Sequence, residues 1–158
     1  MVTTSNFRGL LPSLAYEDAN AMLDWLSATF GFVERSRYVD AGDVVRQAEM
    51  LVGDQELWVS GHGPGYWADH GGRPNLWIGV WVDDVDAQYE RIRGAGVEVE
   101  APVDRDYDVR SLNIFDPEGY HWGFLKRLGT GYTQTVPTED GGLREILSDP
   151  LTADGLMA

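Results

Sequence analysis

Apolar and polar positions along the first part of the chain follow strand and helix periods in a definite order. Residues 19–30 have helical spacing, with Asp18 suited to the N-cap and Gly31 to the C-cap. The apolar stripe of this helix consists of Met22, Trp25, Leu26 and Phe30. The pattern predicts one strand before the helix and three after it, at residues 10–16, 32–39, 44–52 and 55–60.

The same order of elements returns in the second part of the chain. A strand at 76–82 and a helix at 85–93 precede extended segments, which are predicted at 97–103, 109–115 and 120–127. Asp18 lies 66 positions before Asp84, and Arg46 lies 64 positions before Arg110. These offsets predict two copies of one βαβββ unit that share a core. The alternative is two unrelated α+β segments with a coincidental order of elements.

We therefore predict an α+β fold in which two βαβββ modules form a curved mixed sheet cup. The first module spans residues 8–60 and the second spans 76–127. A glycine-rich linker loop at 61–75 joins them, and residues 128–158 form a C-terminal extension. A short helix is expected around 143–147 in this extension, which could dock on the body, dock on a second subunit, or form a loosely held tail.

Composition excludes several classes of function. The 158 residues include no cysteine, so a disulfide scaffold, a zinc finger, an iron–sulfur site and a thiol nucleophile are ruled out. The net charge of −14 argues against binding to nucleic acid or to an anionic membrane surface. The start of the chain does not have the pattern of a secretory signal, and apolar runs are too short to span a bilayer. We therefore expect a cytoplasmic protein.

Several short stretches resemble the vicinal oxygen chelate superfamily, which includes glyoxalase I, extradiol dioxygenases, fosfomycin-modifying enzymes and bleomycin-binding resistance proteins. An aromatic residue followed by Asp-Pro-x-Gly before the last strand is typical of this group. The stretches that carry the resemblance are Leu11–Asp18, Phe30–Phe32, Val80–Asp86, Gly94–Val97 and Phe115–Gly119. The resemblance implies that each module curls into half of a cup, and that the concave face of the sheet holds the ligand.

The resemblance also implies where a metal site would lie. Metal-using members carry a histidine on the first strand and a glutamate on the last strand of each module. The corresponding positions here are Leu11, Trp77, Trp58 and Gly123. None of these side chains can ligate a divalent cation. We therefore expect neither a metal site nor another cofactor, and the protein is identified as a metal-less, drug-binding-like member.

Strand alternation predicts which side chains line the concave face. The expected ligand-binding residues are Trp58, Trp77, Trp81, Ser13, Gln47, Glu49, Glu56, Ser111, Asn113 and His121. Indole faces stack on planar rings and attract cations, and the two glutamates could complement a positive charge. Gly79 and Gly123 favour an open cavity, because glycine on a strand often marks the close approach of a ligand. The alternative is that the tryptophans fill the cup.

The histidines carry less information. His62 and His70 could bind a metal together with Asp69, but a solvated loop is the simpler interpretation of this glycine-rich stretch. His121 is the best candidate general base, because the pKa of histidine lies near neutrality. No partner for it is evident in the sequence, which favours a role as a hydrogen-bonding group in a binding site.

Three hypotheses follow. The first is a metal-independent small-molecule binding protein of the glyoxalase/bleomycin resistance type, which sequesters a planar aromatic or cationic ligand such as an antibiotic. The alternative is a glyoxalase- or dioxygenase-like lyase or isomerase with a displaced or absent metal site, in which His121 would pair with Glu49 or Glu56. The third is a partner-binding domain whose cup is filled. The resemblance further implies a homodimer.

Overall fold

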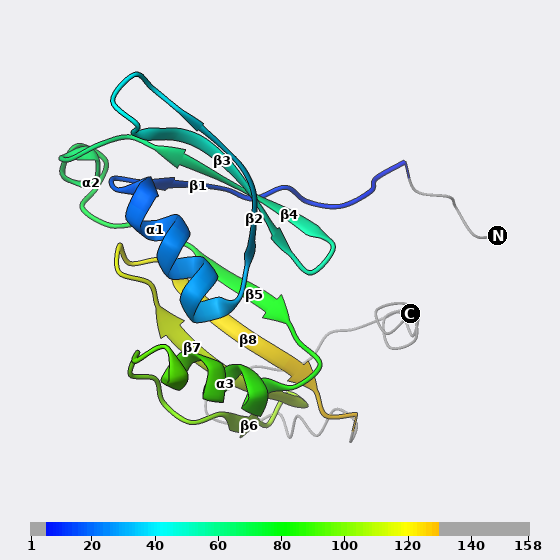
Figure 1. The fold of residues 1–158 in the computed structure, drawn as a ribbon. Helices are drawn as coiled ribbons and strands as arrows, with labels where there is room; N and C mark the ends of the chain where they lie inside the picture. Colours follow the sequence, from blue (N-terminus) through cyan, green and yellow to red (C-terminus); the bar gives the residue numbers. More distant parts are fainter. Residues whose placement is uncertain (1–5, 130–158) are drawn as a thin grey trace, which may run out of the picture.

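The computed structural model describes residues 6–129, and their strands form two four-stranded sheets (Figure 1). Sheet A has the order β1-β4-β3-β2, with bounds β1 (Ser13–Tyr16), β2 (Val33–Val39), β3 (Val45–Val52) and β4 (Gln55–Gly61). Sheet B has the order β5-β8-β7-β6, with bounds β5 (Trp77–Trp81), β6 (Val103–Arg105), β7 (Val109–Phe115) and β8 (His121–Arg127). In each sheet the first pair of strands is parallel and the others are antiparallel. The predicted α+β fold of two βαβββ units is confirmed.

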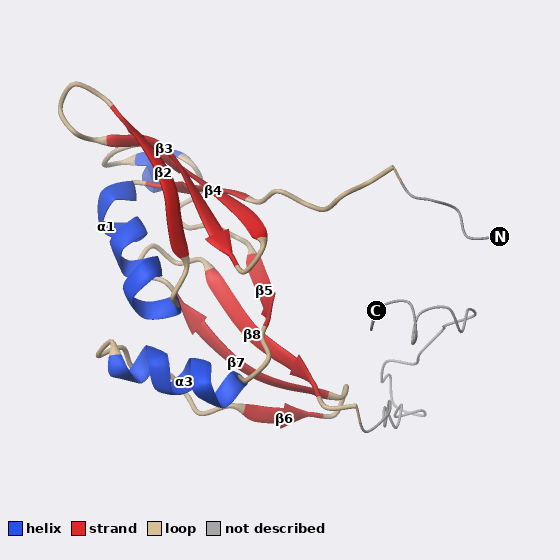
Figure 2. Ribbon diagram, turned by 45° about the vertical axis from the view of Figure 1, so that its right-hand side comes forward, coloured by secondary structure: helices blue, strands red, loops and turns tan. Residues whose placement is uncertain are grey.

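The helices cover one side of both sheets (Figure 2). Helix α1 (Ala19–Trp25) continues as a π-helical turn, η1 (Leu26–Phe30), and α3 (Val85–Gly94) is its counterpart in the second half. The carboxylates of Asp18 and Asp84 accept the backbone N–H of the third residue after each of them, at 3.0 and 2.9 Å. Gly31 ends the first helix at φ +83°, a left-handed conformation that glycine adopts without strain. The predicted caps are therefore confirmed.

The structure differs from the predicted elements at residues 97–102. The sequence predicted an extended segment over 97–103, but β6 contains only Val103–Arg105 and pairs with β7 only as far as Ser111. Pro102 has no N–H to donate to β7, so the ladder ends before it. The linker also differs from a simple loop, because it contains α2 (Tyr66–Asp69).

An aromatic cluster joins the two halves behind the sheets. The Phe30 ring, at the end of the first helical segment, meets the rings of Trp122 and Phe124 at centroid distances of 5.4 and 4.8 Å. Phe32 packs on Trp122 at 5.5 Å. All four side chains are buried. Since Trp122 and Phe124 come from β8, the helix side of sheet B and the end of η1 share one core.

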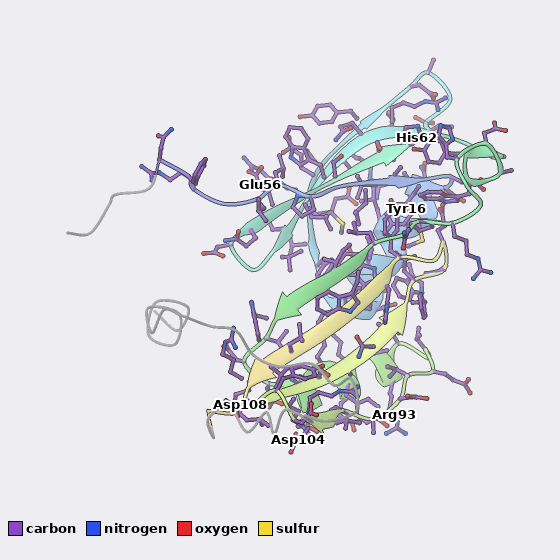
Figure 3. The ribbon with its side chains drawn as sticks, turned by 180° about the vertical axis from the view of Figure 1, so that it is seen from behind. Tyr16, Glu56, His62, Arg93, Asp104 and Asp108 are labelled. Atoms are coloured by element: carbon purple, nitrogen blue, oxygen red, sulfur yellow. The ribbon has the colours of Figure 1, made fainter. Side chains whose placement is uncertain are left out.

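A buried carboxylate ties sheet B to β1. The Asp116 side chain, 4% exposed, accepts the Tyr16 hydroxyl at 2.6 Å and the Trp122 indole N–H at 3.0 Å. Its second oxygen accepts three backbone N–H groups, those of Glu118, Gly119 and Tyr120. Burial and the neighbouring Asp116 carboxylate raise the pKa of Tyr16. The aspartate of the Asp-Pro-x-Gly stretch is therefore a structural link between modules (Figure 3 labels Tyr16 at their junction).

The glutamate of the same stretch holds the linker. Glu118 accepts the backbone N–H groups of Glu17 and Asp18, at 2.7 and 3.1 Å, and the indole N–H of Trp67 at 2.8 Å. The Trp67 backbone N–H donates to the Glu17 carboxylate at 2.9 Å. These contacts hold α2 at the junction of the modules.

The helix expected around 143–147 lies outside the described residues. Within residues 6–129, no helix is both long enough and apolar enough to cross a membrane.

Candidate functional site

The face of sheet B that points away from the helices carries a regular array of side chains in cross-strand rows. Alternate residues of β7 and β8, such as Leu112 and Trp122, are buried on the helix side, so their neighbours face outward. The register gives four rows: Trp77–His121–Phe115, Gly79–Gly123–Asn113, Trp81–Leu125–Ser111–Val103, and Arg127–Val109–Arg105. We call these residues the sheet B face.

The Trp77 indole lies across the two glycines of the second row. A Cβ atom at Gly123 would come within 2.5 Å of the Trp77 ring, and one at Gly79 within 2.7 Å. The indole N–H donates to the Asn113 side-chain oxygen at 3.2 Å. The interpretation that these glycines leave space for a ligand is therefore wrong, because the ring of Trp77 takes that space. Because Gly79 and Gly123 have no side chains, the Trp77 ring can lie directly against the sheet. Trp77 nevertheless remains partly exposed to solvent.

Three large aromatic side chains are exposed on the sheet B face. Trp77 is 49%, Trp81 58% and Phe115 63% exposed. The Arg127 guanidinium lies over the Trp81 ring, 4.6 Å from its centroid. The His121 ring stacks on Phe115 with centroids 4.4 Å apart. Exposed aromatic groups concentrated on one surface are typical of a binding surface rather than of a solvated one.

The outward face of sheet A contains the other half of the predicted lining. Trp58 is the neighbour of Ser13 on β1 and of Glu49 on β3. Arg35 pairs with Glu56 at 2.8 Å and with Glu49 at 3.7 Å. One guanidinium therefore offsets part of the charge of the two glutamates, and their role in complementing a cationic ligand stays a prediction. Gln47 lies opposite Ser60, which places it further along the same face.

The ten predicted residues are thus divided equally between two sheets. Figure 3, which views the sheets from the side opposite the helices, shows Glu56 and His62 at opposite ends of β4. A groove of about 1040 Å³ runs along the free edge of β5 and faces the turn between β3 and β4. Of the predicted residues it brings together Glu56, Trp77 and Trp81. No hydrogen bond or ion pair in residues 6–129 joins His121 to Glu49 or Glu56.

Some residues of the surface were not among those predicted. Phe115 and Arg127 lie on the sheet B face, and Arg35 forms ion pairs with Glu49 and Glu56 on sheet A. Alternation by itself places the first two on the face, since they follow Asn113 and Leu125 by two positions. Predicted Ser111 is only 2% exposed and accepts the Arg105 Nε–H at 3.1 Å, so it supports an arginine rather than meeting solvent.

The residues present do not fit the metal that the fold family implies. No group of three or more histidine, aspartate, glutamate or cysteine side chains in residues 6–129 is arranged to hold a metal ion. At the corresponding positions, Leu11 and Trp58 offer no ligand atom, and the Trp77 indole covers Gly123. We therefore derive no catalytic step that requires a metal.

The two histidines of the linker make ring contacts with one tyrosine. Tyr66 is stacked between His62 and His70, with centroids 4.2 and 4.1 Å apart. The His62 Nε2 atom lies 2.9 Å from the Ser60 hydroxyl, and the His70 Nδ1 atom lies 2.7 Å from the Tyr66 carbonyl oxygen. Both imidazoles are exposed, as a solvated loop requires, and the stack gives the loop a defined shape.

A family model described as the Glyoxalase/Bleomycin resistance protein/Dioxygenase superfamily matches residues 10–124. The chain belongs to this superfamily. The match covers both β-α-β-β-β units, which agrees with the two sheets and their identical strand order. No sequence among curated proteins gives a significant match.

Solved structures of the superfamily share the fold. TioX from Micromonospora sp. ML1 is 27% identical with a TM-score of 0.62, over 77% of this chain and all of that one. A bleomycin resistance determinant encoded on the transposon Tn5 is 16% identical with a TM-score of 0.60, over 77% of this chain and 98% of its own. The fosfomycin resistance protein FosX from Listeria monocytogenes, solved with Mn(II) and sulfate, is 17% identical with a TM-score of 0.56, over 77% of this chain and 93% of its own.

Proposed function

We propose that this superfamily member is a small-molecule binding protein that holds a planar aromatic ligand on the sheet B face without a metal ion. The observation that carries the proposal is the exposed set of rings, Trp77, Trp81 and Phe115, on one side of a single sheet. Trp77 and Trp81 lie on β5 and Phe115 lies on β7, so the backbone positions of the three rings are set by one hydrogen-bonded sheet. Sequestration of an antibiotic by such a surface would protect a cell through binding alone.

The relatives support this class of function. One solved structure of the same fold is a bleomycin-binding protein complexed with bleomycin, 16% identical with a TM-score of 0.59, over 77% of this chain and 99% of that one. The alternative is a lyase or isomerase with a displaced or absent metal site, and for a displaced site no group of three or more suitable side chains is arranged within residues 6–129. No contact in the described residues pairs His121 with an acidic side chain, so the predicted acid–base pair has no geometric support.

We also propose a homodimer and a cytoplasmic location. An aromatic surface that stays open in one chain would be enclosed if a second copy covered it. Sedimentation velocity over a range of concentrations tests the dimer. A monomer at all concentrations would contradict it.

Ligand binding is tested by titrating the protein with a panel of planar aromatic antibiotics and dyes while following tryptophan fluorescence. We expect at least one compound to quench the emission saturably. Trp77→Ala should weaken that binding by roughly tenfold, because a stacked indole contributes about 1–2 kcal/mol. Trp25→Phe, a change on α1 on the opposite side of the sheets, is the matched control and should leave affinity unchanged. Equal affinity of the Trp77→Ala variant would contradict the proposed site.

A further inference from the structure

Two arginines flank one residue on the sheet B face. Arg105 on β6 and Arg127 on β8 are both cross-strand neighbours of Val109 on β7. Residues that are directly opposite in a sheet point to the same side, so both guanidinium groups belong to the face that carries the aromatic rings. The strands that hold them are two spacings apart, which separates their Cα atoms by roughly 10 Å.

Neither guanidinium has an acidic partner in the part of the chain that the structure describes. The arginines that do form ion pairs there are Arg35, Arg37, Arg46, Arg93 and Arg110. The chain carries 26 acidic against 12 basic side chains, so acidic partners are abundant. Both side chains are also partly buried, where an uncompensated charge is costly. Two partly buried cations that form no ion pair within residues 6–129 point to a negative charge supplied from outside this part of the chain.

Both guanidinium groups contact the neighbouring row of the sheet B face, which contains Trp81 and Ser111. Arg127 lies over the Trp81 ring at 4.6 Å, and Arg105 donates its Nε–H to the buried Ser111 hydroxyl at 3.1 Å. Trp81 and Ser111 lie in the same row, on either side of Leu125. The two guanidinium groups are therefore held at the edge of the aromatic surface, and their other N–H groups form no hydrogen bond with a side chain or backbone group of residues 6–129.

We propose that Arg105 and Arg127 bind the carboxylate of a planar aromatic acid whose ring lies against the exposed aromatic side chains of the sheet B face. Guanidinium groups recognise carboxylates through paired, charge-assisted hydrogen bonds. The inference rests on the proposed function and gives the ligand a charge, opposite to the cationic ligand that the sequence favoured. The glutamates that favoured a cation are on the other sheet and are paired with Arg35.

The test compares three probes with one ring system and different charge: 2-naphthoate, 2-naphthamide and 2-naphthylmethylammonium. Binding to the full chain is measured by isothermal titration calorimetry at low and at high salt. We expect 2-naphthoate to bind about tenfold more tightly than the amide, and to lose this advantage at high salt. Arg105→Gln and Arg127→Gln should each reduce 2-naphthoate binding about tenfold and leave the amide unchanged. Arg93→Gln removes a charge from α3, on the helix side, and should change neither.

Each other result overturns the inference in a recognisable way. Equal binding of all three probes, or tighter binding of the ammonium, refutes the anion site while the proposed binding of aromatic ligands stands. Failure of all three probes to bind refutes both. If the arginine variants weaken self-association in sedimentation experiments and leave the preference for 2-naphthoate intact, the guanidinium groups serve contacts with a second copy. Circular dichroism of each variant confirms that it is folded.

Discussion

The link between Tyr16 and Asp116 tests whether the two modules depend on one another for stability. Tyr16→Phe removes a single hydroxyl that is buried and donates at 2.6 Å to a carboxylate. The ring remains, including its edge contact with Tyr120 at 5.2 Å. The variant therefore removes a hydrogen bond and leaves no large cavity.

The magnitude follows from the partners that remain. A hydrogen bond to a charged group contributes about 1.5–3 kcal/mol. Asp116 would keep four other donors, namely the Trp122 indole and three backbone N–H groups, so its charge stays solvated by the protein. We expect the free energy of unfolding to fall by about 2 kcal/mol, a substantial part of the 5–15 kcal/mol that is typical of a folded domain.

Urea unfolding followed by tryptophan fluorescence and far-ultraviolet circular dichroism measures this change. The midpoint should fall while the dependence on urea stays constant, because the surface exposed on unfolding is the same. Tyr38→Phe is the matched control, since that tyrosine is 57% exposed on β2. A loss of less than about 0.5 kcal/mol, or an equal loss in the control, would refute the assignment of Asp116 as a link between modules.

The pH dependence gives the same link an independent test. Burial and Asp116 raise the pKa of Tyr16 above the ordinary tyrosine value of 10.0. A raised folded-state pKa means that unfolding releases a proton at high pH, so the stabilisation is complete below about pH 10 and is lost as the pH rises above it. The difference in unfolding free energy between the wild type and Tyr16→Phe should therefore narrow above pH 10. A constant difference up to pH 11 would contradict this reasoning.

Three further predictions concern single positions. Gly61→Ala should lower the free energy of unfolding by at least about 1–3 kcal/mol in urea titrations, because its Cβ would collide with the Val45 carbonyl oxygen; a neutral result would argue against the strand spacing there. Gly123→Ala should displace the Trp77 ring and weaken binding of aromatic ligands several-fold with little loss of stability, and unchanged tryptophan emission would show that the ring does not lie on this glycine. Asp84→Ala should cost about 1 kcal/mol in urea unfolding through loss of the α3 cap, whereas an unchanged midpoint would mean that the cap contributes nothing.

Local patterns in the sequence determined much of the fold. Carboxylates at Asp18 and Asp84 cap helices as expected, because capping depends on neighbouring backbone groups only. Alternation correctly placed Trp77 and Trp81 on one face and Trp122 and Phe124 on the other, since the period of a strand is a local property. The prediction of an extended strand over 97–103 was wrong, because Pro102 has no N–H for the hydrogen bonds between β6 and β7 and the pairing of these strands begins only at Val103.

The candidate site depended on contacts between residues that are distant in the chain. Alternation showed which residues face outward, but it did not show that Arg35 reaches the glutamates of β3 and β4. Nor did it show that Gly123 receives an indole from another strand, or that Arg105 and Arg127 share a row across β7.

The sequence by itself therefore determined the two β-α-β-β-β units and the sides of their strands, which follow from local periodicity. Only the tertiary structure decided which side chains meet, because strand register and ion pairing are set by packing across the sheet. For this protein that difference decides the charge of the proposed ligand. In the sequence, the outward-facing Glu49 and Glu56 suggested a cationic ligand. In the structure these glutamates form ion pairs with Arg35, whereas Arg105 and Arg127 lie beside the aromatic rings without an ion pair in residues 6–129.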